Sequence, residues 1–123
     1  MAKKILLSII EIGGYPDFSK LYQEFGYEVI KIKTMRKALS LLKKTRPDII
    51  VAEFIFGPKY STFISNLDSL FAMIAGKYPD TKLILFVDKA EDHHLEKLRQ
   101  HYALQVDSLF YPIEQQQLRE SLI

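Results

Sequence analysis

Apolar positions along this chain alternate five times between short continuous runs and helical spacing. Short runs rich in Ile, Leu, Val and Phe predict buried strands, and longer stretches with apolar residues three or four apart predict amphipathic helices. The predicted strands are residues 5–10, 27–32, 48–52, 81–87 and 108–111. The predicted helices are residues 17–25, 35–44, 61–75, 91–102 and 114–123. Strand–helix units in strict alternation predict a parallel sheet with right-handed crossovers and helices on both faces.

Local signals support several of these boundaries. Thr34 precedes the second helix, where its hydroxyl can accept a hydrogen bond from the first turn. Gly26 and Gly76 stand where the first and third helices are expected to end, because glycine readily takes the left-handed conformation of a helix terminus. Residues 5–10 are apolar except for Ser8, as in a central parallel strand, whereas residues 27–32 alternate and suit an edge strand.

Composition places the chain among globular proteins. It has 123 residues, of which 48% are hydrophobic, and this suits one compact domain over residues 1–123. Cysteine is absent, so disulfides, thiolate metal sites and cysteine nucleophiles are excluded. The apolar run at residues 5–10 is too short for the core of a signal peptide, and no stretch reaches the roughly 20 apolar residues that span a bilayer. We therefore expect a soluble, cytoplasmic domain without membrane contacts.

Several short stretches together resemble the receiver domain of response regulators. They are "KKILL", "FGYEV", "ALSLLKKTRPDIIV", "YPDTKLILFV" and "YP" at 111–112, in the family's order and at nearly its spacing. The resemblance covers the whole chain. It implies a flavodoxin-like, doubly wound (βα)5 sandwich of three layers with strand order 2-1-3-4-5, and a role in two-component signalling.

Receiver chemistry needs an aspartate nucleophile, an acid pair that holds a divalent metal, and a lysine and a hydroxyl that bind the phosphoryl oxygens. The resemblance places Glu53 at the nucleophile position and Ser108 at the position of an aromatic switch residue. The acid pair, the hydroxyl and the lysine fall on Ile9, Ile10, Phe86 and Tyr111. These changes turn a polar pocket into an apolar one. We therefore expect a degenerate pseudo-receiver with no metal, no cofactor and no catalytic residue, that is, not an enzyme.

Glu53 has three interpretations. It can imitate a phosphorylated aspartate, but the usual lysine and hydroxyl partners of the phosphate are missing. It can contact a partner or a small ligand directly. The favoured interpretation is structural, with a buried carboxylate that accepts hydrogen bonds from Tyr111 or from loop amides.

The loop that follows Glu53, "FIFGPKYSTF", is unusually aromatic for a solvated segment. Its rings are Phe54, Phe56, Tyr60 and Phe63. We expect them to cover the space left by the acid pocket, and an exposed docking patch is the alternative.

Basic residues gather on the second predicted helix, in a stretch from Glu28 to Asp48 that has no acid between its ends. One face carries Arg36, Lys37, Lys43 and Lys44. This is interpreted as a solvated face, with docking of an acidic partner as the alternative. Nucleic acid is disfavoured because the net charge is only +2. Three histidines, His93, His94 and His101, lack the spacing of a helical metal site and are read as surface residues.

Three functions stay open. The first is a signalling module that docks a partner protein, or a second copy of itself, without phosphorylation. The resemblance would put this contact on the fourth helix, fifth strand and fifth helix, including some core residues: Leu95, Leu98, Tyr102, Ser108, Leu109 and Phe110. The second is a flavodoxin-like domain that binds a small molecule in an apolar pocket at the carboxyl end of the sheet. The third is an atypical receiver that is still phosphorylated.

Overall fold

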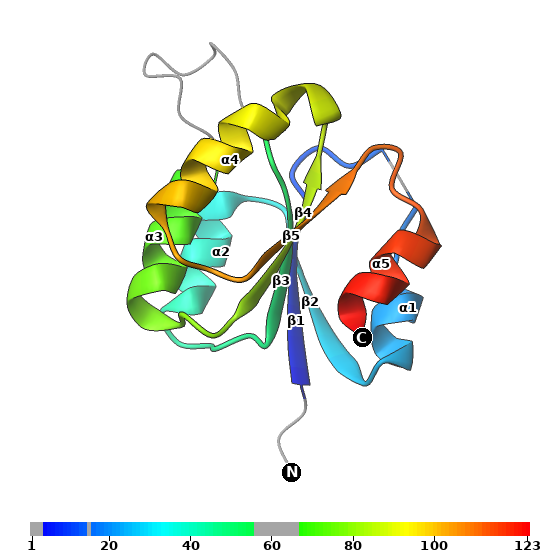
Figure 1. Cartoon of the computed structure of the whole chain (residues 1–123). Coiled ribbons are helices and arrows are strands. Elements are labelled where there is room, and N and C mark those ends of the chain that lie inside the picture. The colour runs from blue at the N-terminus through cyan, green and yellow to red at the C-terminus, as the bar shows by residue number, and fades with distance from the viewer. Residues whose placement is uncertain (1–3, 15, 56–66) are drawn as a thin grey trace.

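Five parallel strands form one sheet in the order β2-β1-β3-β4-β5 (Figure 1), which confirms the predicted order. The computed structural model describes residues 4–14, 16–55 and 67–123. The strands are β1 (Lys4–Ile9), β2 (Tyr27–Ile32), β3 (Ile49–Glu53), β4 (Lys82–Val87) and β5 (Val106–Phe110). β2 lies at one edge, as its alternating pattern predicts, and every residue of β3 is buried at the centre.

Helices cover both faces of the sheet, so the layers are helix, sheet and helix (Figure 1). On one face lie α1 (Ser19–Glu24) and α5 (Gln115–Leu122). On the other lie α2 (Met35–Leu42), α3 (Asp68–Lys77) and α4 (Asp92–His101), the last preceded by the short 3-10 helix η1 (Lys89–Glu91). None of the helices in these described segments is long and apolar enough to span a membrane.

The sheet separates two hydrophobic clusters. Successive residues of a strand point to opposite faces, so Leu7 and Ile9 pack under α2, α3 and α4 while Leu6 packs under α1 and α5. Phe71 and Phe86 are the largest fully buried side chains, one in each cluster. Burial of such a side chain contributes about 1.5–3 kcal/mol to folding. These clusters hold the carboxyl ends of the strands in place.

The helix-end signals had mixed outcomes. The Thr34 hydroxyl accepts a hydrogen bond from the Lys37 amide at 3.2 Å, and Gly26 has φ +86° just after α1, so both predictions are confirmed. The prediction that Gly76 ends the third helix is wrong, because Gly76 lies inside α3. The helix ends at Lys77, and the hydroxyl of the next residue, Tyr78, donates a hydrogen bond to the Leu42 carbonyl at 2.8 Å. This tertiary contact, which the local sequence does not reveal, anchors the end.

Other boundaries differ by a few residues. α2 ends at Leu42 rather than at 44. β3 extends by one residue because Glu53 pairs with Phe86 of β4. β5 begins at Val106, two residues before the predicted start at 108, because Val106 pairs with Leu83 of β4. The expected start of the third helix at residue 61 lies outside the described residues.

Candidate functional site

The carboxyl ends of β1, β3 and β4 bring three of the predicted site residues together. Glu53 is the last residue of β3 and pairs with Phe86 of β4, while Ile10 directly follows β1, the other neighbour of β3. Ile10 and Phe86 pack in the cluster under α1 and α5. Glu53 has only 2% of its surface exposed, so its carboxylate needs partners inside the protein.

Those partners are backbone amides of the loop that follows β1. One oxygen of Glu53, Oε1, accepts hydrogen bonds from the N–H groups of Glu11 at 2.7 Å and Ile12 at 2.8 Å. The other, Oε2, accepts from Gly13 at 2.9 Å. Successive amides that converge in this way form a concave anion-binding site. Loop amides, one of the two partners expected for a structural Glu53, thus hold its buried carboxylate.

The loop can fold back on Glu53 because of its two glycines. Gly13 has φ +81° and Gly14 has φ +96°, both in the left-handed region that glycine enters without steric cost. This curvature turns three successive N–H groups toward the end of β3. The backbone turn at Gly13 and Gly14 therefore allows the loop amides to bind an anion within the chain, the carboxylate of Glu53.

The other predicted pocket residues occupy different surroundings. Ile9 is fully buried on the opposite face of the sheet, packed with α2, α3 and α4, so its side chain does not line the site. Phe86 is also fully buried, and its ring meets that of Phe18 edge to face, with centroids 6.2 Å apart.

Tyr111 follows β5 and is 40% exposed. Burial, together with the negative charges of Glu53 and Asp88, raises the pKa of the Tyr111 hydroxyl to about 12. Tyr111 therefore lies close enough to Glu53 to feel its charge, and it stays protonated at neutral pH.

The residues of this site do not fit the magnesium ion of a receiver domain. Magnesium is bound through carboxylates and other oxygen ligands, but Ile9 and Ile10 offer no side-chain oxygen, and the oxygens of Glu53 face N–H donors. Those donors favour an anion and disfavour a cation. Across the described part of the chain, no group of three or more His, Cys, Asp or Glu side chains is placed to hold a metal.

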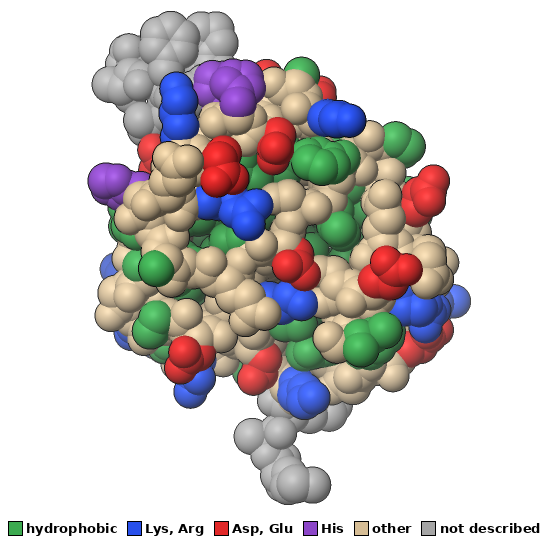
Figure 2. All heavy atoms as spheres, in the orientation of Figure 1, with side chains coloured by type: hydrophobic (Ala, Val, Ile, Leu, Met, Phe, Trp, Pro, Cys, Tyr) green, Lys and Arg blue, Asp and Glu red, His purple; other side chains and the backbone are tan. Residues whose placement is uncertain are grey.

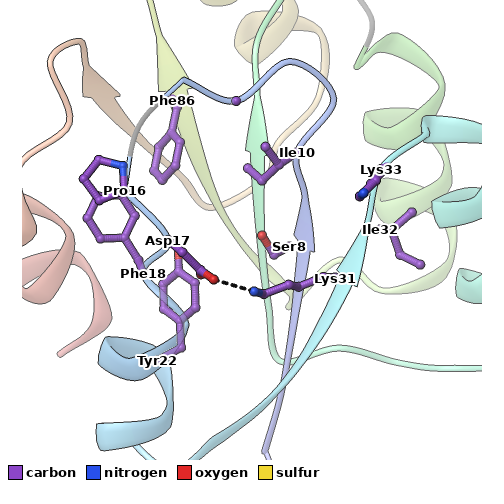
Figure 3. Close-up of a pocket in the computed structure, with 11 residues that line it drawn as sticks. Ser8, Ile10, Pro16, Asp17, Phe18, Tyr22, Lys31, Ile32, Lys33 and Phe86 are labelled. Atoms are coloured by element: carbon purple, nitrogen blue, oxygen red, sulfur yellow. Dashed lines mark hydrogen bonds and ion pairs between the residues drawn. The ribbon is translucent and has the colours of Figure 1, made fainter.

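A cavity of about 220 Å³ opens beside this site, between the ends of β1 and β2 and the start of α1 (Figure 3). Ile10 and Phe86 belong to its walls. The residues that sequence reasoning did not assign to it are Ser8, Gly13, Pro16, Asp17, Phe18, Tyr22, Lys31, Ile32 and Lys33. One signal was visible in the sequence, because Ser8 interrupts an otherwise apolar strand.

The predicted docking residues lie around α4, β5 and α5. Leu95 has no exposed surface and is a core residue, so it is not available to a partner. The others are partly buried: Leu98, Tyr102, Ser108, Leu109 and Phe110. Between these elements runs a shallow groove of about 540 Å³, lined in part by Arg99, Ser108 and Glu120. Figure 2 shows apolar side chains here among acidic and basic ones.

The remaining predicted features are on the surface or in the core. The side chains of the basic face, Arg36, Lys37, Lys43 and Lys44, are all exposed. His93 and His94 have ring centroids 3.8 Å apart, and His94 also lies 3.5 Å from the Glu91 carboxylate. Phe54 is buried in the cluster under α2, α3 and α4. The other loop aromatics, Phe56, Tyr60 and Phe63, lie outside the described residues.

Comparison with solved structures shows the fold. The chain superposes on a response regulator from Thermotoga maritima with a TM-score of 0.72, at 16% identity, over 98% of this chain and 95% of that one. The signal receiver domain of an HD domain-containing protein from Pseudomonas fluorescens Pf-5 gives a TM-score of 0.69, at 18% identity, over 98% and 92% of the two chains.

A third similar structure is the receiver domain of a sensor histidine kinase from Pseudomonas aeruginosa PAO1, with a magnesium ion coordinated in its active-site cleft. It gives a TM-score of 0.67 at 16% identity, over 98% of this chain and 95% of that one. No protein-family model matches the chain, and no curated protein matches it in sequence. The chain therefore has the fold of receiver domains.

Proposed function

We propose that this chain is a degenerate receiver domain of a two-component-type signalling protein, and that it binds a signalling partner, or a second copy of itself, without being phosphorylated. One observation carries the proposal. At the position of the phosphoryl-accepting aspartate stands Glu53, and three loop amides hold its carboxylate.

Phosphoryl transfer to this carboxylate is opposed by its surroundings. An attacking oxygen must approach the phosphorus in line, and a cation must neutralise the charge that the phosphoryl group brings. Both oxygens of Glu53 instead accept amide hydrogen bonds, and Glu53 is 2% exposed. Ile10 and Phe86 stand beside it where the resemblance expects a metal ligand and a hydroxyl. These side chains therefore supply neither an available nucleophile nor ligands for a metal ion.

The same hydrogen bonds support a constant rather than a switched surface. They join the loop after β1 to the end of β3, so these two segments are held in one arrangement without a phosphate. At the position of the aromatic switch residue, Ser108 has no ring that can move, and its hydroxyl lies 3.5 Å from Arg99. We infer a docking face on α4, β5 and α5 that is always ready to bind.

Beryllofluoride, a mimic of the phosphoryl group, tests the absence of phosphorylation directly. Amide resonances of Glu53, Phe86, Ser108 and Tyr111 are followed by NMR as magnesium and then beryllofluoride are added. We expect no saturable shift. A saturable shift that spreads from Glu53 to Ser108 would mean an atypical receiver that still takes a phosphoryl group, and so would a labile acyl phosphate after treatment with a small phosphodonor.

Charge reversal tests the docking face. Arg99→Glu changes the groove between α4 and β5, and Lys20→Glu on α1 is a matched control because Lys20 is also an exposed base but lies outside both this groove and the basic face of α2. We expect Arg99→Glu to weaken self-association, measured by light scattering, or binding of a co-purified signalling protein, by about tenfold or more. Equal binding by both variants and the unaltered chain would place the interface elsewhere.

A small-molecule-binding domain is the second candidate function. One observation favours it, the cavity beside Ile10 and Phe86, which has a partly polar lining. It does not require the docking face, and both activities can exist in one domain.

A further inference from the structure

The cavity between β1, β2 and α1 has the size of a site for a single ring. Its volume of about 220 Å³ exceeds the cavity of roughly 150 Å³ that accepts benzene, and it is smaller than the roughly 300–1,000 Å³ of sites for drug-sized ligands. Its apolar walls come from Ile10, Phe18 and Phe86, and the edge-to-face contact of the two phenylalanine rings makes one corner rigid (Figure 3).

Two buried hydroxyl groups line this apolar space. Ser8 on β1 is 7% exposed and Tyr22 on α1 is 3% exposed. Within the described residues, neither hydroxyl makes a hydrogen bond. A buried polar group without a partner is destabilising, so this pair of hydroxyls favours a ligand with a polar group in this part of the cavity. Burial and the negative charge of Asp17 raise the pKa of Tyr22, which therefore remains a hydrogen-bond donor at neutral pH.

Charged residues stand at the rim of the cavity. Lys31 and Asp17 form an ion pair at 2.6 Å, which links β2 to the start of α1 beside the cavity (Figure 3). Their side chains are 58% and 64% exposed, and such exposed pairs contribute little stability, so the pair can open. Lys33 is exposed, and among the described residues its ammonium group has no partner. The rim therefore offers a free positive charge to a ligand.

We propose that this cavity binds a small monocyclic aromatic acid that carries a ring hydroxyl. The ring lies between Ile10, Phe18 and Phe86. The ring hydroxyl bonds to Ser8 and Tyr22 in the buried part, because a neutral group costs less to bury than a charge. The carboxylate stays at the rim, where Lys33 attracts it. This site goes beyond the docking function and does not depend on it.

The probe is 4-hydroxybenzoate, titrated into the full chain and followed by NMR and calorimetry. We expect saturable shifts at Ser8, Tyr22 and Lys33 and none on α4 or β5. Benzoate, which lacks the ring hydroxyl, should bind about tenfold more weakly, because the two buried hydroxyls stay unpaired. The neutral 4-hydroxybenzyl alcohol should bind several-fold more weakly, and its binding should not depend on salt.

Variants separate binding in the cavity from adventitious contact. Ser8→Ala should weaken 4-hydroxybenzoate about threefold to tenfold, and Ser8→Val, which fills the cavity, should abolish binding. Ser121→Ala is the matched control, because Ser121 is also a serine with 7% exposure but lies on α5 outside the cavity. Lys33→Gln changes only the exposed rim and should weaken binding about threefold without affecting the fold.

Two results would overturn the proposal. One is the absence of saturation by 4-hydroxybenzoate up to its solubility limit, which would indicate that only water pairs with the two hydroxyls. The other is equal binding by the unaltered chain and by Ser8→Val, which would place the contact elsewhere. Neither result affects the docking proposal, because the docking test measures the effect of Arg99, which lies near β5 at the opposite edge of the sheet from β2.

Discussion

The Glu53 carboxylate accepts a hydrogen bond from the Gly13 amide at 2.9 Å, which ties the end of β3 to the loop that follows β1. The two residues are 40 positions apart in the chain. Two further amides, those of Glu11 and Ile12, complete the set around the carboxylate. Glu53 is thus part of the framework of the domain, and its replacement is a test of stability.

Replacement of Glu53 should destabilise the domain. In Glu53→Gln the amide group places an N–H donor against N–H donors of the loop, so we expect a loss of about 1–3 kcal/mol in the free energy of unfolding. Urea denaturation measures it. Glu28→Gln, on an exposed position of β2, is the control and should change stability by less than about 0.5 kcal/mol. Equal stability of the two variants would argue against a structural role for Glu53.

Small carboxylates should partly rescue the truncated variant. Glu53→Ala leaves the loop amides and a space where the carboxylate was, and an anion such as formate can occupy such a concave site. We expect the midpoint of thermal unfolding of Glu53→Ala to rise with formate and to rise less with chloride. The unaltered chain is the control, because its own carboxylate already fills the site. If formate affects both proteins alike, the amides do not form an anion site.

Two glycines should respond to alanine in opposite directions. Gly13 has φ +81°, so Gly13→Ala forces a side chain into the left-handed region and should cost about 1–2 kcal/mol. Gly76 lies inside α3 with open space around it, so Gly76→Ala should stabilise by about 0.5–1 kcal/mol. Chemical denaturation of the pair measures both effects. A stabilising Gly13→Ala would contradict the loop geometry.

The ion pair of Asp17 and Lys31 should show a particular pH dependence. The hydrogen bonds from Lys31 and Ser19 lower the pKa of Asp17 from 3.8 to about 2. A lowered pKa means that the carboxylate stabilises the folded state above pH 4, and that this contribution disappears as the pH falls toward 2. Because the pair is exposed, the contribution is below about 1 kcal/mol. Asp17→Asn should therefore be slightly less stable than the unaltered chain at pH 7, but equal to it at pH 2, in urea denaturation.

Tyr111 should report the charge of Glu53. The pKa of its hydroxyl is about 12 because of burial first and the charges of Glu53 and Asp88 next. Glu53→Gln removes one of these charges and should lower the pKa of Tyr111, while burial keeps it above the ordinary value of 10. Carbon NMR of the labelled tyrosine rings measures this, with Tyr27, whose pKa is raised by burial and Asp48, as an internal control. An unchanged pKa of Tyr111 in Glu53→Gln would show that the Tyr111 hydroxyl and the Glu53 carboxylate do not interact electrostatically.

The order of the elements was readable from the chain because periodicity is local. Alternating apolar runs and helical stretches predicted five strand–helix units in a parallel sheet, and the resemblance to receiver domains implied the strand order 2-1-3-4-5. The structure confirms both. Helix ends were less predictable. Gly26 ends α1 and Gly76 does not end α3, although both are glycines at similar places in the pattern. The difference lies in the contact of Tyr78 with Leu42, which only the packing of α3 beside α2 creates.

The sequence by itself determined the fold class, the position of Glu53 at the end of a buried strand, and the apolar side chains of Ile10 and Phe86. It left three interpretations of Glu53 open. Every residue except proline has a backbone N–H group, so the residue types alone do not show which amides bind the carboxylate. The tertiary structure decided which groups the carboxylate meets.

The same holds for the cavity. Ser8 stands out in the sequence as the polar residue of an apolar strand. That it lines one cavity together with Tyr22 and Lys33 depends on where α1 and β2 lie relative to β1. Periodicity records which face of an element is buried. The partners across that face come from segments distant in the chain, and only the folded arrangement brings them together.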